Sequence, residues 1–156
     1  VVGFEANGGF LVGSMLEKGG RSLQALPTRD AVLPIVALLA MAREQGVPLA
    51  QLSAGLPPRF TASDRIQNFA TAKSQQLLQE LSGSDAALRA FLAPLGLEPA
   101  GIDQTDGLRI TLTNAEILHL RPSGNAPELR CYAEAENQAR ASELANAGLH
   151  RVESMA

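Results

Sequence analysis

Residues 108–134 read LRITLTNAEILHLRPSGNAPELRCYAE, and this stretch decides the fold of the C-terminal part of the chain. Apolar and polar residues alternate through 108–113, which is the period of a strand with one buried face. Two further strands are predicted at 116–120 and 128–134, on either side of a loop rich in Pro, Ser, Gly and Asn. The sequence therefore predicts a β-meander.

Outward from the meander, the pattern predicts helices and one more strand. Residues 59–69 are strand-like, whereas 72–81 and 136–147 show helical spacing, and another helix opens at Ser84 and stops at Pro94. We therefore expect residues 57–156 to form an α+β domain in which a four-stranded sheet is packed by helices.

Residues 1–56 show a different pattern. Short strands are predicted at each end of a glycine-rich loop spanning 5–9, and a helix over 31–43 follows Asp30, with Gly46 as its stop signal. The apolar part of this helix is too short to span a bilayer, so we expect it to be buried. Two or three strands with one helix indicate part of an α/β domain whose other half is missing. The Pro57-Pro58 pair predicts the linker.

Composition excludes several functional classes. The chain has 156 residues, 46% hydrophobic and 19% charged, with a net charge of -3. This acidic balance argues against a nucleic-acid-binding protein, and no segment is expected to enter a membrane. One cysteine, Cys131, fits a reducing cytoplasm and an ordinary buried side chain. The absence of an initiator Met at Val1 suggests a fragment or a processed chain.

The loop from Arg121 to Pro127 carries the clearest chemistry. Its two prolines stiffen the ends, Gly124 can adopt positive φ, and short polar side chains leave backbone N–H groups able to point into one concavity. Arg121 adds a planar fork of donors that suits a phosphate. By composition alone, an ordinary hairpin turn with a solvated arginine explains the same residues.

Two motifs resemble those of the α-D-phosphohexomutase superfamily, which includes phosphomannomutase and phosphoglucomutase. The stretch RPSGNAP at 121–127 resembles the R-P-S-G-T-E-P phosphate-binding loop of domain 4, and GFEANGG at 3–9 resembles the G-E-x-S-G-H sugar-binding loop of domain 3. The motifs stand in the family's order. Departures are Asn125-Ala126 for Thr-Glu, Asn7 for Ser and Gly9 for His.

The resemblance implies that 1–56 is the end of domain 3 and that 57–156 is a TATA-binding-protein-like domain 4. It implies interconversion of hexose 6-phosphate and hexose 1-phosphate through a hexose 1,6-bisphosphate, in a cytoplasmic enzyme. The remaining domains would supply a phosphoserine and Mg²⁺, so this chain alone is expected to be inactive, without catalytic or metal-binding residues. The implied phosphate-binding residues are Arg121, Ser123, Gly124 and Asn125. The implied sugar-binding residues are Glu5 and Asn7.

Other features favour structural roles. Ser63 lies in TASD, which resembles the family's catalytic serine loop but lacks its Asn-Pro continuation, so we expect an edge strand or turn. Asp103 and Asp106 lack the spacing of a Mg²⁺ site and indicate a hairpin turn. Arg130 could face either phosphate or solvent, and His119 shares a strand face with Arg121. The alternative function is a freestanding α+β ligand-binding or interaction module without catalysis.

Overall fold

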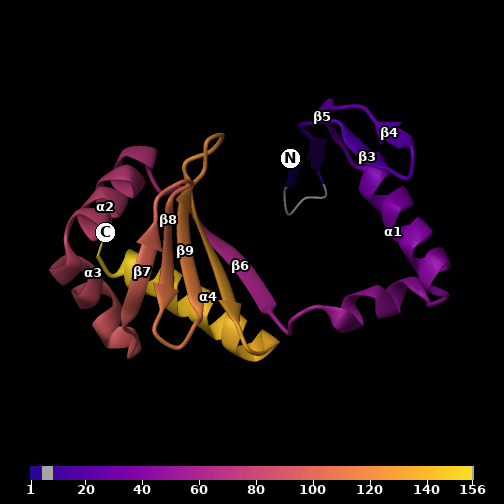
Figure 1. The fold of residues 1–156 in the computed structure, drawn as a ribbon. Coiled ribbons are helices and arrows are strands. Elements are labelled where there is room, and N and C mark those ends of the chain that lie inside the picture. The colour runs from indigo at the N-terminus through magenta and orange to yellow at the C-terminus, as the bar shows by residue number, and fades with distance from the viewer. Residues whose placement is uncertain (5–8, 156) are drawn as a thin grey trace. The chain divides into compact units, whose positions relative to one another are not determined.

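The computed structural model describes residues 1–4 and 9–155, and the chain divides into two compact units, Val1–Leu56 and Pro57–Ala156. The second unit is built on one antiparallel sheet of five strands in the order β6-β10-β9-β8-β7 (Figure 1). The strands are β6 (Phe60–Gln67), β7 (Pro99–Asp103), β8 (Leu108–Leu112), β9 (Ile117–Pro122) and β10 (Glu128–Ala135).

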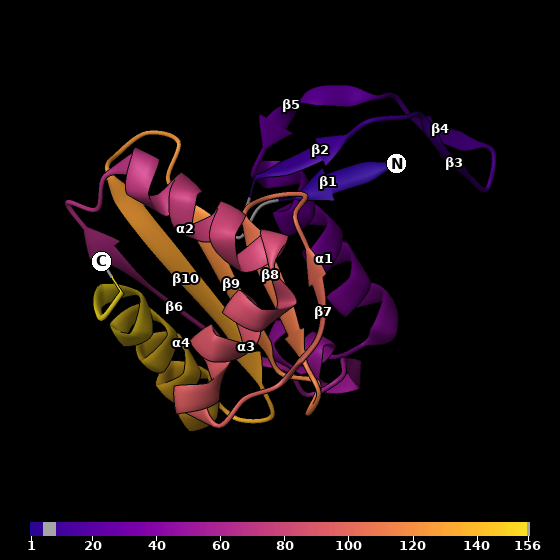
Figure 2. The ribbon, with the colours of Figure 1, turned by 90° about the vertical axis from the view of Figure 1, so that its left-hand side faces the viewer.

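Three helices cover one face of this sheet (Figure 2). They are α2 (Thr71–Gly83), α3 (Asp85–Leu92) and α4 (Gln138–Glu153). Alternate residues of β8, β9 and β10 point into the core, where aliphatic side chains predominate. The fully buried core residues include Leu81, Phe91, Leu108, Ile110, Leu118, Leu120, Leu129, Leu144 and Val152. The opposite face of the sheet carries the polar residues of the same strands and is covered by none of these helices.

Short polar residues define where the helices begin. The Ser84 hydroxyl accepts a hydrogen bond from the N–H of Ala87 at 3.2 Å, and the Asn137 side chain accepts one from Arg140 at 2.8 Å. These contacts satisfy backbone donors that have no partner inside the first turn. At the other end of α3, the short helix η2 (Ala93–Leu95) stops at Gly96 with φ 68°.

The predicted α+β class is confirmed, with one strand more than expected. The prediction missed β7, where Pro99 and Gly101 interrupt the strand pattern and a register shift occurs between them. Such residues are tolerated because β7 lies at the edge of the sheet. Ser63 lies in β6, the other edge strand, as expected.

The first unit contains a three-stranded sheet ordered β1-β2-β5 and a separate hairpin. Its strands are β1 (Val2–Phe4), β2 (Phe10–Val12) and β5 (Leu26–Asp30), and the hairpin is β3 (Leu16–Lys18) with β4 (Arg21–Leu23). Helix α1 (Val32–Gln45) and the 3₁₀ helix η1 (Leu49–Gly55) follow. The Asp30 carboxylate accepts from the N–H groups of Val32 and Leu33 at 2.7 and 2.8 Å, which confirms its capping role.

Helix α1 corrects one expectation. It was predicted to be buried, yet Ala42 is its single buried residue, and Val32, Ile35 and Leu39 are each more than half exposed. The small sheet and hairpin of this unit provide too little surface to cover an apolar helix on every side. No single helix in the described residues is long and apolar enough to cross a membrane; α1 and η1 together reach that length and composition, bent by 83°.

Candidate phosphate-binding loop

The loop between β9 and β10 is held at its base by backbone hydrogen bonds. The Ser123 N–H donates to the carbonyl of Glu128 at 2.9 Å, and the Glu128 N–H donates to Ala126 at 2.8 Å. The carbonyl of Pro127 accepts from the N–H of Phe69, at the start of the segment that leads into α2. Ser123 is also buried. The backbone hydrogen bonds therefore hold Ser123, Ala126 and Pro127 in place.

The tip of the loop keeps unused donors. The Asn125 N–H makes a long bond of 3.4 Å to the Ser123 hydroxyl, whereas the N–H groups of Gly124 and Ala126 have no hydrogen-bond partner among the described residues. Gly124 does not adopt the positive φ that a glycine permits at this position. A Cβ at Gly124 would meet no atom within 4 Å, so the loop is open on that side. An anion could therefore approach the backbone closely.

Arg121 stands at the end of β9 with its guanidinium on the open face of the sheet. Its Nε donates to Asp106 Oδ1 at 2.8 Å, and this hydrogen bond is the main reason that the pKa of Arg121 is raised. Sequence reasoning placed Asp106 in a hairpin turn, which is confirmed, but missed this pairing.

Gly107 explains how Asp106 reaches Arg121. Gly107 has φ 84°, and a Cβ there would lie 2.4 Å from the carbonyl oxygen of Leu120 and 3.0 Å from the Cα of Arg121. Only glycine lets the β7–β8 turn approach β9 so closely. In the sequence, the only indication of the contact between Asp106 and Arg121 was the Asp106-Gly107 pair in a predicted hairpin turn.

The open face beside Arg121 is polar. Arg121 lies directly opposite Arg130, and His119 lies opposite both Tyr132 and Arg109. His119 Nε2 donates to the carbonyl of Asp106 at 2.5 Å, and its ring lies 5.6 Å from that of Tyr132. Since directly opposed residues share a face, Arg130 faces the same side as Arg121.

The expected sugar-binding residues Glu5 and Asn7 lie outside the described residues. The structure does place their neighbour Gly9, which is buried. A Cβ at Gly9 would lie 2.8 Å from both Cγ and Cδ of Arg29 on β5. The side chain of Arg29 therefore fills the space that a larger residue at position 9 would need, which gives a physical reason for Gly9.

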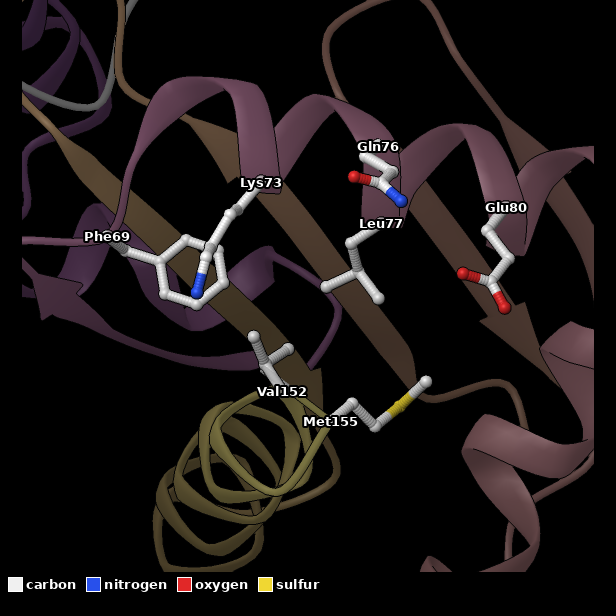
Figure 3. A pocket seen from close by; sticks show the side chains of 7 residues that line it. All are labelled: Phe69, Lys73, Gln76, Leu77, Glu80, Val152 and Met155. Atoms are coloured by element: carbon white, nitrogen blue, oxygen red, sulfur yellow. The ribbon is translucent and has the colours of Figure 1, made fainter.

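A separate groove lies on the helical layer. Figure 3 shows Lys73 and Glu80 of α2 along one wall, with Val152 of α4 and Met155, which follows that helix, opposite. Its floor is apolar, and it contains none of the residues expected to bind phosphate or sugar.

Comparison with known proteins agrees with this geometry. The family model described as "Phosphoglucomutase/phosphomannomutase, C-terminal domain" matches residues 66–149, which span most of the sheet, its helices and the loop. The chain belongs to this family. Two curated phosphomannomutases are similar to it: one from Sinorhizobium fredii is 48% identical over 149 residues, and one from Salmonella muenchen is 45% identical over 157.

These matches cover 96% and 99% of this chain but 31% and 32% of the two relatives, so the chain spans about a third of their length. A crystal structure of parafusin, an exocytosis-sensitive phosphoprotein and phosphoglucomutase from Paramecium, in an open form, shares the fold. Its TM-score is 0.51 at 16% identity, covering 83% of this chain and 28% of parafusin. The chain thus corresponds to a portion of its relatives that includes the family's C-terminal domain.

The described residues of this family member do not fit a Mg²⁺ site. They contain no group of three or more acidic, histidine or cysteine side chains able to hold a metal. Asp106 is paired with Arg121, and Asp103 accepts a hydrogen bond from the N–H of Thr105 at 2.8 Å, which lowers its pKa. The carboxylates of Asp103 and Asp106 therefore stabilise the β7–β8 turn and its contact with β9.

Cys131 is completely buried, as expected, and burial raises the pKa of its thiol to about 12. A thiol with so high a pKa is protonated at neutral pH and is a poor nucleophile.

Proposed function

We propose that this chain supplies the phosphate-binding and sugar-binding portion of an enzyme that interconverts hexose 6-phosphate and hexose 1-phosphate. The observation that carries the proposal is the 121–127 loop, whose unpartnered N–H groups at Gly124 and Ala126 lie beside Arg121 on an open face. Arg121, Ser123, Gly124 and Asn125 bind the phosphate that is not transferred. Backbone donors and a guanidinium together match its charge and its oxygen geometry.

Glu5 and Asn7 complete the proposal by binding sugar hydroxyls, as the family resemblance implies. A carboxylate accepts from two adjacent hydroxyls, and an amide both donates and accepts. Substitution of Glu5 by Gln should therefore alter the preference among hexose phosphates more than the affinity for inorganic phosphate.

The reaction needs groups from the rest of the enzyme. Phosphoryl transfer requires an in-line nucleophile and a cation that neutralises the moving group. In this proposal, other domains provide the phosphoserine and Mg²⁺, and a hexose 1,6-bisphosphate is the intermediate and activator. The lone buried cysteine supports a cytoplasmic setting. The exposed apolar surface of α1 favours a part of a larger protein over a freestanding binding module.

The test is the affinity of the complete enzyme for hexose phosphates after Arg121→Ala. Loss of a charge-assisted contact costs about 1.5–3 kcal/mol, which is roughly a 10- to 100-fold loss of affinity. Arg109→Ala is the control, because Arg109 lies on the same face and only approaches Glu134 at 3.9 Å. Unchanged affinity in Arg121→Ala, or an equal loss in both variants, would contradict the assignment.

A further inference from the structure

Three arginines lie in one row across the open face of the sheet. Arg130 on β10 is directly opposite Arg65 on β6 and directly opposite Arg121 on β9, so all three side chains emerge on the same side. We call Arg65, Arg130 and Arg121 the arginine row. Like charges directly opposite each other destabilise a sheet, so the row needs a compensating interaction.

Nearby carboxylates offset the positive charge of the three arginines to different degrees. Arg121 has a close hydrogen bond to Asp106, whereas Glu128 approaches Arg65 at 3.6 Å and Arg130 at 3.7 Å. Neither of those two separations is a hydrogen bond. Within the described part of the chain, the guanidinium groups of Arg65 and Arg130 make no hydrogen bond, and their donors remain available.

A hollow lies over this end of the row. Its lining consists of Arg65, Arg130, Ser63, Tyr132 and Asp64. Ser63 and Tyr132 bring two hydroxyl groups to the same hollow, and the Tyr132 side chain also contributes to the raised pKa of Arg121. Asp64 also lines the hollow, but it lies opposite the core residue Cys131, so its side chain emerges on the other face of the sheet, where its Oδ1 accepts from the N–H of Arg65 at 2.8 Å.

The row offers two neighbouring positions for anions. Neighbouring strands lie about 4.8 Å apart, so the gap between Arg121 and Arg130 and the gap between Arg130 and Arg65 form two adjacent anion positions. The first position adjoins the 121–127 loop. Two guanidinium forks around each phosphoryl group would satisfy the donors that Glu128 leaves free.

We propose that Arg65 and Arg130, with the hydroxyls of Ser63 and Tyr132, form a second phosphoryl position beside the loop, so that this face accepts a diphosphate group. The proposal rests on the proposed function of the loop for the first phosphoryl group. Molecules that carry a diphosphate group would then compete with hexose phosphates for this face.

The experiment titrates the 156-residue chain with inorganic phosphate and with inorganic pyrophosphate by calorimetry. We expect pyrophosphate to bind at least about tenfold more tightly. Arg65→Gln should reduce that preference by about fivefold or more and change phosphate affinity less than twofold. Arg89→Gln is the matched control, because Arg89 lies on α3 in ion pairs with Asp85 and Glu98 and not on the open face.

The outcomes separate this proposal from the one on which it rests. Equal affinities for the two anions, or a preference unchanged in Arg65→Gln, would overturn the second position. Dependence on Arg65 for a hexose 1,6-bisphosphate but not for pyrophosphate would overturn the assignment to a diphosphate. Unchanged phosphate affinity in Arg121→Gln would instead remove the first position. Thermal unfolding of each variant confirms that the fold is retained.

Discussion

Two glycines near the loop have opposite roles at the level of single residues. A Cβ at Gly124 meets open space, whereas one at Gly107 meets the backbone of β9 at 2.4 Å. We expect Gly124→Ala to change stability by less than about 0.5 kcal/mol but to weaken phosphate binding several-fold, because the methyl group occupies the side from which the anion approaches.

Gly107→Ala should instead lower stability by about 2–4 kcal/mol, since it combines positive φ with a steric clash. Urea unfolding and phosphate titration of both variants measure the two effects. A destabilised Gly124→Ala protein, or a Gly107→Ala protein as stable as the parent, would contradict these roles.

The residue scale also shows what sequence could not predict. The resemblance located Arg121, Ser123 and Asn125 in one loop, but it gave no indication that Asp106 holds the Arg121 guanidinium. That contact depends on how closely the β7–β8 turn approaches β9, and the two residues are separated by 15 positions. The position of Arg65 beside Arg130 likewise depends on strand order and register.

At the level of secondary-structure elements, Gly148 lets helix α4 pack closely against the sheet. A Cβ at Gly148 would lie 2.8 Å from Leu118 Cδ1 and 3.3 Å from Cys131 Sγ, whereas one at Gly83, the last residue of α2, would meet nothing within 4 Å. Alanine is the better helix former at both positions.

We therefore expect Gly83→Ala to stabilise the protein by about 0.5 kcal/mol and Gly148→Ala to destabilise it by about 1–3 kcal/mol. Chemical denaturation of the two variants gives the comparison. If Gly148→Ala were as stabilising as Gly83→Ala, the helix would have room to move away from the sheet.

A second element-level contact joins the start of α4 to the β8–β9 turn. Arg140 Nε and Nη2 donate to the two oxygens of Glu116 at 2.8 and 2.9 Å, and Glu116 is buried. The hydrogen bond from Arg140 is the main cause of the lowered pKa of Glu116. Because the folded-state pKa lies below the ordinary value of 4.5, this contribution to stability is present above pH 4.5 and is lost as pH falls.

Glu116→Gln should lower the free energy of unfolding by about 1.5–3 kcal/mol at pH 7. The difference should be smaller at pH 3, where the parent protein loses the ionised pair as Glu116 becomes protonated. Glu143→Gln is the control, since Glu143 also contacts Arg140 at 3.1 Å but is largely exposed, and its loss should cost under about 1 kcal/mol. Unfolding free energies at the two pH values test this. A pH-independent difference between the parent and Glu116→Gln would rule out the ionised pair as its source.

Most elements of the second unit followed from sequence because their buried and exposed residues alternate clearly, as in β8 and β10. The prediction missed β7 because Pro99 and Gly101 disfavour a strand, and only its position at the sheet edge makes them acceptable. The burial of α1 was predicted wrongly for a different reason. The hydrophobic residues of α1 favour burial, but burial also requires other elements to pack against the helix. The sequence of the helix does not show whether such elements are present.

At the level of the whole molecule, we expect the 156-residue chain to bind phosphosugars without converting them. The two proposed binding loops would stabilise the bound ground state, whereas in this proposal the nucleophile and the cation come from other domains. The assay measures mutase activity with Mg²⁺ and a hexose 1,6-bisphosphate. Ser63→Ala is the control, because Ser63 lies within strand β6 and on the open face. Turnover by the chain that disappears in Ser63→Ala would contradict the expectation that the chain is inactive.

The division of the chain between Leu56 and Pro57 also affects how such enzymes can diversify. The core of the second unit, its sheet and the 121–127 loop are all encoded by one uninterrupted stretch of about a hundred codons. A genetic crossover at that boundary would therefore exchange the unit that carries the proposed phosphate-binding loop between homologous genes without dividing its core. Homologues would in this way exchange the arginine row while keeping the residues encoded upstream of Pro57, where we propose that the sugar is bound.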